Sequence, residues 1–198
     1  MLDKIVLFCG KAGSGKTTLA NALYSCLVDK GYSCYQVSFA TPLKQKLGDL
    51  LQADFVNNAD LKNESVIFKD KLISCRSLLQ KLGDLVRSVD KDYFGKHVCF
   101  ELKRYKKDIV IIDDLRFYNE LSPLVSFAKR LYIVGIDSAN ANNDNSAELI
   151  HASENYENLK EFIKRFIANH NSVAWLELES YETREVSNDK DVLLDFVL

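Results

Sequence analysis

The chain of 198 residues has the length of one domain, and its 47% hydrophobic and 27% charged residues are typical of a globular protein. The 8 Gly and 2 Pro argue against a long flexible linker, and the net charge of −2 argues against binding a nucleic-acid polymer. No apolar run of about 18 residues or signal peptide is found. We expect one soluble, cytoplasmic domain with no membrane partner.

The cysteines are odd in number and lack the Cys-x-x-Cys spacing of metal and redox sites. Several of them fall within apolar patterns. We therefore expect reduced, mostly buried thiols. The cysteines are Cys9, Cys26, Cys34, Cys75 and Cys99.

A phosphate-binding loop is predicted near the N-terminus. Residues 10–17 complete the pattern Gly-x4-Gly-Lys-Ser/Thr, directly after the apolar run 5–9 and before an amphipathic stretch. The glycines allow successive N–H groups to surround a phosphate at a helix N-terminus. Lys16 is expected to reach the β- and γ-phosphates of ATP, and the Thr17 hydroxyl to ligate Mg²⁺. The expected ATP-binding residues are Lys11, Ala12, Gly13, Ser14, Gly15, Lys16, Thr17 and Thr18.

The next elements are predicted from hydrophobic periodicity. A helix over 19–27 ends at Gly31, and a short strand follows over 34–39. Another helix follows Pro42, whereas 52–75 is polar and irregular. A helix is predicted over 76–89. A second helix, which contains Phe94 to Leu102, is predicted to have Asp92 as its N-cap.

The run Ile109 to Ile112 is apolar throughout, as expected of a strand that is covered on both faces. A helix through 119–128 and a second buried strand over 131–136 follow. The alternation of strands and helices predicts an α/β fold with a parallel sheet.

The C-terminal third is less regular. Residues 137–150 are rich in Asn, Asp and Ala and are predicted to form a mobile loop. The pattern over 158–169 favours a helix followed by a strand. The alternative is a short strand at 165–168, with Ser172 capping a final helix. The apolar end, 192–198, is expected to dock on the domain.

Two acidic residues end the strand 109–112. In a parallel sheet this end lies beside the phosphate loop, so Asp113 and Asp114 are expected at the nucleotide, with Asp113 ligating Mg²⁺. Arg116 follows and is a candidate for stabilising a transferring phosphoryl group. The alternative is a surface arginine paired with Glu120.

The helix over 76–89 carries a polar stripe. Arg76, Gln80, Gly83 and Arg87 are spaced 4, 3 and 4 residues apart, which gathers them within about 60° of arc. Two arginines, an amide and a glycine suit a phosphate and a flat group. A solvated face is the alternative. The leucines and valines of this helix are expected to pack on the core.

Other catalytic patterns are missing from the sequence. His151 has no second His or Cys at ligand spacing, which makes a zinc site improbable. No nucleophile elbow or Ser-His-Asp order is found, so hydrolase chemistry has no support.

Taken together, these residues resemble the bacteriophage and viral deoxynucleoside monophosphate kinases, within the P-loop nucleoside monophosphate kinase family. The resemblance spans most of the chain. The matching segments are the loop 10–17, Phe39 to Lys44, Arg76 to Gly83 with Arg87, Asp114 to Glu120, His151 to Glu154, and Asn169 to Ser172.

The resemblance implies a three-layer α/β/α P-loop fold with a mainly parallel five-stranded sheet. It divides the single domain into a core, 1–41 and 108–180, a helical acceptor-binding region, 42–107, and a lid-like loop, 137–154. The lid and the helical region are expected to close over bound nucleotides, which excludes water.

The implied activity is transfer of the ATP γ-phosphate to a (deoxy)nucleoside monophosphate, with Mg²⁺. The expected partner is a small nucleotide, and a homodimer is a family-level expectation. Lys16, Arg116 and Asp114 are expected to be catalytic. The expected acceptor-binding residues are Lys44, Arg76, Gln80, Arg87, Asp114, Arg116, Glu120, His151 and Glu154.

Two other functions are kept open. The first is a P-loop kinase for another small acceptor, phosphomevalonate-like or a coenzyme precursor. The second is a P-loop nucleotide switch or ATPase, although no Asn-Lys-x-Asp or Leu-Ser-Gly-Gly-Gln segment is found.

Overall fold

The computed structural model describes residues 2–68, 71–105, 108–137, 155–179 and 186–198. The loop predicted over 137–150 lies outside these ranges, except for its first residue. Among the described helices, none combines the length and the apolar character that crossing a bilayer requires.

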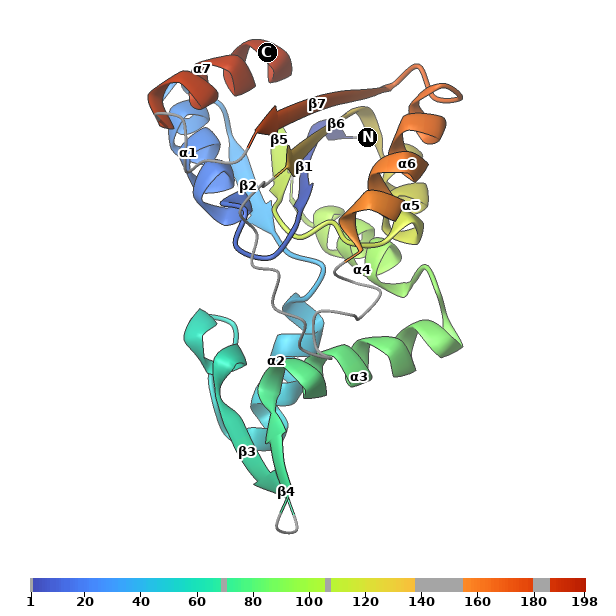
Figure 1. The fold of residues 1–198 in the computed structure, drawn as a ribbon. Coiled ribbons are helices and arrows are strands. Elements are labelled where there is room, and N and C mark those ends of the chain that lie inside the picture. Colours follow the sequence, from blue (N-terminus) through green and yellow to red (C-terminus); the bar gives the residue numbers. More distant parts are fainter. Residues whose placement is uncertain (1, 69–70, 106–107, 138–154, 180–185) are drawn as a thin grey trace.

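The described core is built on one parallel sheet of five strands (Figure 1), in the order β2-β5-β1-β6-β7. All neighbouring strands run parallel, so their carboxyl ends meet at one edge. This confirms the predicted fold class. The strands are β1 (Leu2–Gly10), β2 (Cys34–Val37), β5 (Ile109–Ile112), β6 (Ala128–Asp137) and β7 (Val173–Glu179).

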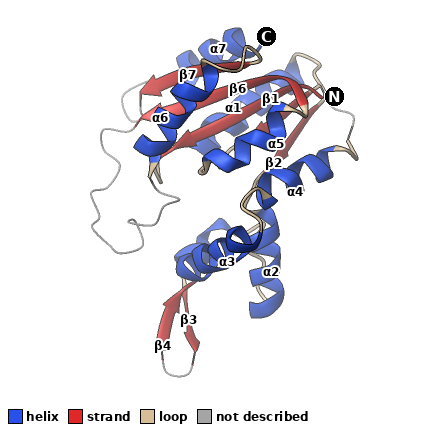
Figure 2. Ribbon diagram, turned by 90° about the vertical axis from the view of Figure 1, so that its right-hand side faces the viewer, coloured by secondary structure: helices blue, strands red, loops and turns tan. Residues whose placement is uncertain are grey.

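Helices cover both faces of the sheet, which gives the three layers (Figure 2). Alternate residues of β1 point to opposite faces, so Leu7 and Phe8 belong to two different buried clusters. One face is covered by α1 (Lys16–Asp29) and α7 (Val186–Val197). The other is covered by α4 (Tyr93–Leu102), α5 (Leu121–Val125) and α6 (Tyr156–Ile167).

An insertion projects from the carboxyl edge of the sheet (Figures 1 and 2). It has a small hydrophobic cluster of its own around Leu47, Phe55 and Cys75. The prediction of an irregular segment over 52–75 is wrong, because the segment contains a 3-10 turn and an antiparallel hairpin. The elements are α2 (Thr41–Leu51), η1 (Ala59–Asn63), β3 (Ser65–Phe68), β4 (Lys71–Ser74) and α3 (Cys75–Val89).

The predicted helix over 119–128 is too long. Residues Tyr118–Glu120 form the 3-10 turn η2, α5 ends at Val125, and β6 begins at Ala128 because Ala128 pairs with Leu2 of β1. Asp92 lies at the N-cap position of α4, but its side chain makes no capping hydrogen bond.

The favoured order of a helix and then a strand near the C-terminus is confirmed by α6 and β7. Ser172 therefore precedes a strand and caps no helix. The apolar end forms part of α7, and Leu193 and Val197 are fully buried against the sheet. All cysteines are free and all but Cys26 are buried, as expected.

Candidate active site

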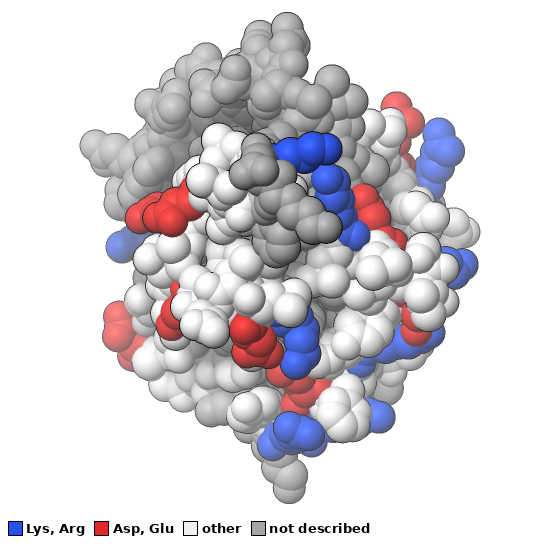
Figure 3. All heavy atoms as spheres, turned by 90° about the horizontal axis from the view of Figure 1, so that it is seen from below, with Lys and Arg blue, Asp and Glu red and all other residues white. Residues whose placement is uncertain are grey.

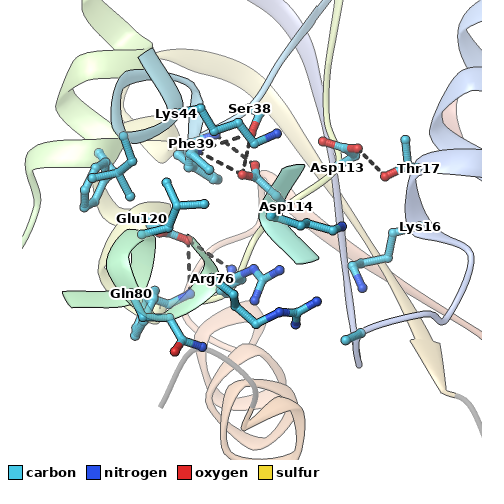
Figure 4. A pocket seen from close by; sticks show the side chains of 18 of the residues that line it. Lys16, Thr17, Ser38, Phe39, Lys44, Arg76, Gln80, Asp113, Asp114 and Glu120 are labelled. Carbon is cyan, nitrogen blue, oxygen red and sulfur yellow. Dashed lines mark hydrogen bonds between the residues drawn. The ribbon is translucent and has the colours of Figure 1, made fainter. Parts of the chain in front are cut away.

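A cavity of about 520 Å³ lies where the phosphate loop, the end of β5 and the insertion meet. Figure 4 shows Lys16 and Thr17 on one side of it and Arg76 and Gln80 on the other. Most of the predicted site residues therefore come together, although they are far apart in sequence. The lining residues that carry charged or polar side chains are Ser14, Lys16, Thr17, Thr18, Ser38, Lys44, Lys62, Arg76, Gln80, Arg87, Asp113, Asp114, Arg116 and Glu120.

The phosphate loop has the backbone that its glycines allow. Gly13 and Gly15 have φ values of 78° and 84°, and Gly15 directly precedes the first turn of α1. At Gly10, φ is 147° and a Cβ atom would lie 2.5 Å from the Ile136 carbonyl oxygen. The open N–H groups at the start of a 14-residue helix form an anion site.

The Lys16 amine lies over this loop. Its Nζ donates hydrogen bonds to the carbonyl oxygens of Gly10 at 2.9 Å and Lys11 at 2.5 Å. The lysine is thus held at the mouth of the anion site, within reach of a phosphate there. Ala12 to Thr18 all line the cavity, whereas Lys11 does not.

Thr17 and Asp113 form the oxygen pair that the sequence predicts for Mg²⁺. The Thr17 hydroxyl donates to Asp113 Oδ2 at 2.6 Å, next to the anion site. Magnesium takes hard oxygen ligands and keeps several waters, so one hydroxyl and one carboxylate beside phosphates fit it. Within the described ranges there is no group of three metal-binding side chains.

The Asp114 carboxylate does not face Thr17 but lies on the side of Ser38 and Phe39 (Figure 4). Its carboxylate accepts hydrogen bonds from the Ser38 hydroxyl at 2.5 Å and from the N–H groups of Phe39 and Ala40 at 2.8 and 2.9 Å. Burial, with the nearby charge of Asp113, raises its pKa. Asp114 therefore holds the turn that leads into α2. It also lines the cavity, and its expected catalytic and acceptor-binding roles stay predictions.

Glu120 has a similar task beside Arg116. The buried Glu120 carboxylate accepts hydrogen bonds from the backbone N–H groups of Arg116 and Phe117, each at 3.0 Å. Burial raises the pKa of Glu120 to about 7, and these two bonds oppose the shift. Glu120 therefore fixes the backbone that carries Arg116 into the cavity, which is a positioning task. It also lines the cavity, and the acceptor contact expected from the resemblance stays a prediction.

The polar stripe of α3 faces the cavity, so it is not a solvated face. Arg76, Gln80 and Arg87 all line it. The Arg87 guanidinium lies 3.8 Å from the centre of the Phe117 ring and 5.1 Å from that of Phe94, so it is fixed by stacking.

Gly83 was expected to admit a flat ligand group, but the space beside it is occupied by Arg87. A Cβ atom at Gly83 would lie 2.9 Å from Arg87 Nη1 and 3.4 Å from Leu43 Cδ1. The expectation that all apolar residues of α3 pack on the core is also wrong, because Leu85 is 63% and Val89 85% exposed.

Lys44 of α2 lines the cavity as expected, and Lys62 of η1 is a further lysine that the sequence patterns did not single out. Two short apolar runs, 66–68 and 72–73, flank the polar residues 69–71, and this pattern could have revealed the hairpin that follows Lys62. His151 and Glu154 lie outside the described residues.

The face of the molecule on the side of the insertion carries interspersed basic and acidic residues (Figure 3). No continuous basic stripe is visible among its described atoms. The positive side chains that gather in this part of the protein are those that line the cavity.

Comparisons with solved structures find chains that are similar to this one at low sequence identity. APS kinase from Mycobacterium tuberculosis is 14% identical, with a TM-score of 0.40 over 98% of this chain and 96% of the other. Shikimate kinase from Acinetobacter baumannii is 12% identical, with a TM-score of 0.45 over 98% and 92%. Cobyrinic acid a,c-diamide synthase from Mycobacterium smegmatis is 18% identical, with a TM-score of 0.48 over 98% and 80%.

A comparison with curated proteins gives no match. A family model gives one: the model of phosphomevalonate kinase matches residues 8–130. The match starts before the phosphate loop, spans the insertion and ends in β6, so it includes every described residue that lines the cavity. Because it covers more than half of the sequence, this chain belongs to the phosphomevalonate kinase family.

Proposed function

We propose that the protein transfers the γ-phosphate of ATP to the phosphate group of a small acceptor. One observation carries the proposal. The phosphate loop with its Thr17–Asp113 pair and the cationic stripe of α3 line a single cavity. One wall suits a nucleoside triphosphate, and the other suits a second phosphate.

The transfer needs little covalent chemistry from the protein. An acceptor phosphate oxygen attacks the γ-phosphorus, the bond to the bridging oxygen breaks, and ADP leaves. Lys16 is placed to neutralise charge on the β- and γ-phosphates, and Arg116 to stabilise the transferring group. Bound Mg²⁺, held by Thr17 and Asp113, would supply additional charge neutralisation at the phosphates.

Arg76 and Arg87 are proposed to hold the acceptor phosphate. Arg87 suits this task because its stacking on Phe117 fixes the guanidinium before a ligand arrives. A guanidinium can form two parallel hydrogen bonds to a phosphate, which orients the attacking oxygen.

The first candidate acceptor is a phosphomevalonate-type compound, and the membership in the phosphomevalonate kinase family supports it. A (deoxy)nucleoside monophosphate is the second candidate, and the observation that favours it is Gln80. Its amide lines the cavity between Arg76 and Arg87, where it could pair with the edge of a base.

The experiment is ADP release from ATP-Mg²⁺ by purified protein. The acceptors are phosphomevalonate, dephospho-coenzyme A and each common ribo- and deoxynucleoside monophosphate. Release stimulated by one acceptor class supports the kinase and selects the class. ADP release at the same rate with and without every acceptor, or ADP release that only a protein partner stimulates, contradicts the proposal and favours a nucleotide switch.

A further inference from the structure

The mechanism above leaves two cationic side chains of the cavity without a task, Lys44 and Lys62, and the sequence patterns did not single out Lys62. Lys62 lines the cavity from η1, on a different element from Lys44 of α2 and Arg76 of α3. In Figure 1 the teal turn around residue 60 lies at the end of the insertion that faces the sheet. Lys62 is thus presented towards the reacting groups and not towards the hairpin tip.

The hairpin explains how Lys62 reaches this place. The register of β3 and β4 pairs Ser65 with Ser74, so the residues just before β3 lie beside those just after β4. Accordingly, the backbone N–H of Cys75 donates to the Glu64 carbonyl at 2.9 Å. One step further out, Arg76 Nη2 donates to Asn63 Oδ1 at 3.4 Å. The pairing therefore brings Lys62 to the side of Arg76.

The turn itself is built to hold this position. Asn58 caps η1, because its Oδ1 accepts from the Asp60 N–H at 3.1 Å. Leu61, next to Lys62, packs against the hydrophobic cluster of the insertion. The backbone at Lys62 is therefore fixed on both sides, and its side chain lines the cavity.

The charges around Lys62 are not balanced. Burial lowers the pKa of Lys62, and the positive charges of Arg76, Lys44 and Arg116 lower it further, whereas the negative charge of Asp60 opposes the shift without cancelling it. Within the described ranges, neither Lys62 nor Lys44 forms an ion pair or a side-chain hydrogen bond with a carboxylate. Like charges held together in a partly desolvated cavity repel each other, and an anion between them removes the repulsion.

The acidic residues of the cavity do not supply that anion. Asp113 accepts from Thr17, Asp114 is bonded to the turn before α2, and Glu120 is bonded to the backbone at Arg116. These carboxylates are used by the phosphate side and by the fold. Asp60, two residues away in η1, opposes the positive charges at Lys62 only in part, so a ligand anion in the cavity would suit this lysine.

We propose that Lys62 binds an oxyanion group of the acceptor, together with Lys44 and Arg76, and so determines which acceptors are used. This proposal rests on the proposed kinase function. The oxyanion has one of two sources, the acceptor phosphate or a second acidic group such as a carboxylate. Both are recognised by the same chemistry, the charge-assisted hydrogen bonds of an ammonium group.

The first test is acceptor kinetics of Lys62→Gln, Lys62→Arg and a control, Lys46→Gln. Lys46 also belongs to the insertion, but its side chain is 76% exposed and pairs with Asp49. We expect Lys62→Gln to raise KM for the acceptor about tenfold. Its kcat and its KM for ATP should change less than about twofold. Lys62→Arg should restore most of the affinity, and Lys46→Gln should match the wild type.

Two acceptors distinguish the sources of the oxyanion. Phosphomevalonate carries a phosphate and a carboxylate, whereas thymidine monophosphate has a phosphate as its acidic group. A raised KM for every accepted substrate assigns Lys62 to the phosphate, and a rise confined to phosphomevalonate assigns it to the carboxylate. An unchanged acceptor KM in Lys62→Gln overturns the proposal.

The second test does not depend on turnover. With ADP-Mg²⁺ occupying the phosphate loop, inorganic phosphate is titrated and binding is followed by the fluorescence of Trp175. We expect Lys62→Gln to weaken phosphate binding about tenfold and Lys62→Arg to restore it. Equal phosphate affinity in the wild type and Lys62→Gln excludes the acceptor phosphate as the source of the oxyanion, and together with an unchanged KM for phosphomevalonate it contradicts the proposal. If no acceptor is phosphorylated by the wild type, the kinase function fails, and this titration still decides whether Lys62 binds a phosphate group.

Discussion

The hydroxyl of Thr17 donates a hydrogen bond of 2.6 Å to Asp113 Oδ2, across 96 positions of sequence. This contact joins the first turn of α1 to the end of β5. It places a hydroxyl and a carboxylate oxygen side by side at the proposed phosphate site, where Mg²⁺ prefers such ligands.

The first prediction concerns this pair. Asp113→Asn removes a charge from the proposed metal site, so the Mg²⁺ concentration for half-maximal activity should rise about tenfold or more. The measurement is ADP release as a function of Mg²⁺, with the exposed Asp29→Asn as the control. The same Mg²⁺ dependence in Asp113→Asn and wild type would exclude Asp113 from the site.

The second prediction concerns the phosphate loop. Lys16→Ala should lower kcat by about 100-fold or more, because the amine neutralises charge that develops in the transition state. Lys30→Ala, an exposed lysine after the end of α1, is the control and should retain wild-type rates. Phosphoryl transfer that survives Lys16→Ala would refute the assigned role.

The third prediction uses the close approach at Gly83. A Cβ atom there would meet Arg87 Nη1 at 2.9 Å, so Gly83→Ala should displace the flexible guanidinium from its stacked position. We expect the acceptor KM to rise about three- to tenfold, with the KM for ATP unchanged. The control is Lys81→Ala on the exposed side of α3. If KM rises equally for both substrates, Arg87 does not act on the acceptor alone.

The fourth prediction concerns pH. The folded state holds the Glu120 proton up to about pH 7, whereas an ordinary glutamate loses it near 4.5. The raised pKa therefore stabilises the folded state below about pH 4.5, and this stabilisation is lost as the pH rises from about 4.5 to about 7. The loss is on the order of 3 kcal/mol.

Glu120→Gln keeps an oxygen that can accept from the Arg116 and Phe117 N–H groups but cannot ionise. Thermal unfolding between pH 4.5 and 7.5 should therefore show a weaker decline for Glu120→Gln than for the wild type. Glu161→Gln, whose side chain is 73% exposed, is the control and should follow the wild type. Parallel pH profiles for all three proteins would rule out a raised pKa at Glu120.

The fifth prediction concerns Asp114. Asp114→Ala leaves the Ser38 hydroxyl and the N–H groups of Phe39 and Ala40 without their acceptor. We expect a loss of about 3 kcal/mol in unfolding free energy, measured with denaturant. At temperatures where the variant is folded, ATP binding should persist, because the phosphate loop does not contact this carboxylate. A selective loss of catalysis with wild-type stability would instead support the catalytic role that the sequence analysis expects for Asp114.

Much of the core could be predicted because its signals are local. The glycines of 10–17 permit the backbone that a phosphate loop needs, and the apolar run Ile109–Ile112 is typical of a strand buried on both faces. Since parallel strands end at one edge, the position of Asp113 directly after this run also predicts that it lies beside the loop. The stripe of Arg76, Gln80 and Arg87 follows from helical spacing alone.

The surroundings of Asp114, Glu120 and Lys62 depend on the tertiary structure. Asp113 and Asp114 are adjacent aspartates with different contacts. Asp113 accepts from Thr17 at the phosphate site, whereas Asp114 accepts from the turn before α2. This difference depends on how the insertion packs and cannot be predicted from the two residue types. Lys62 reaches the cavity through the pairing of β3 with β4.

The sequence by itself determined the sheet, the phosphate loop and the cationic stripe, because each depends on the spacing of residues within one element. Only the tertiary structure decided which charged groups of the cavity form hydrogen bonds within the protein, such as those of Asp114, because such bonds join segments that are distant in the chain.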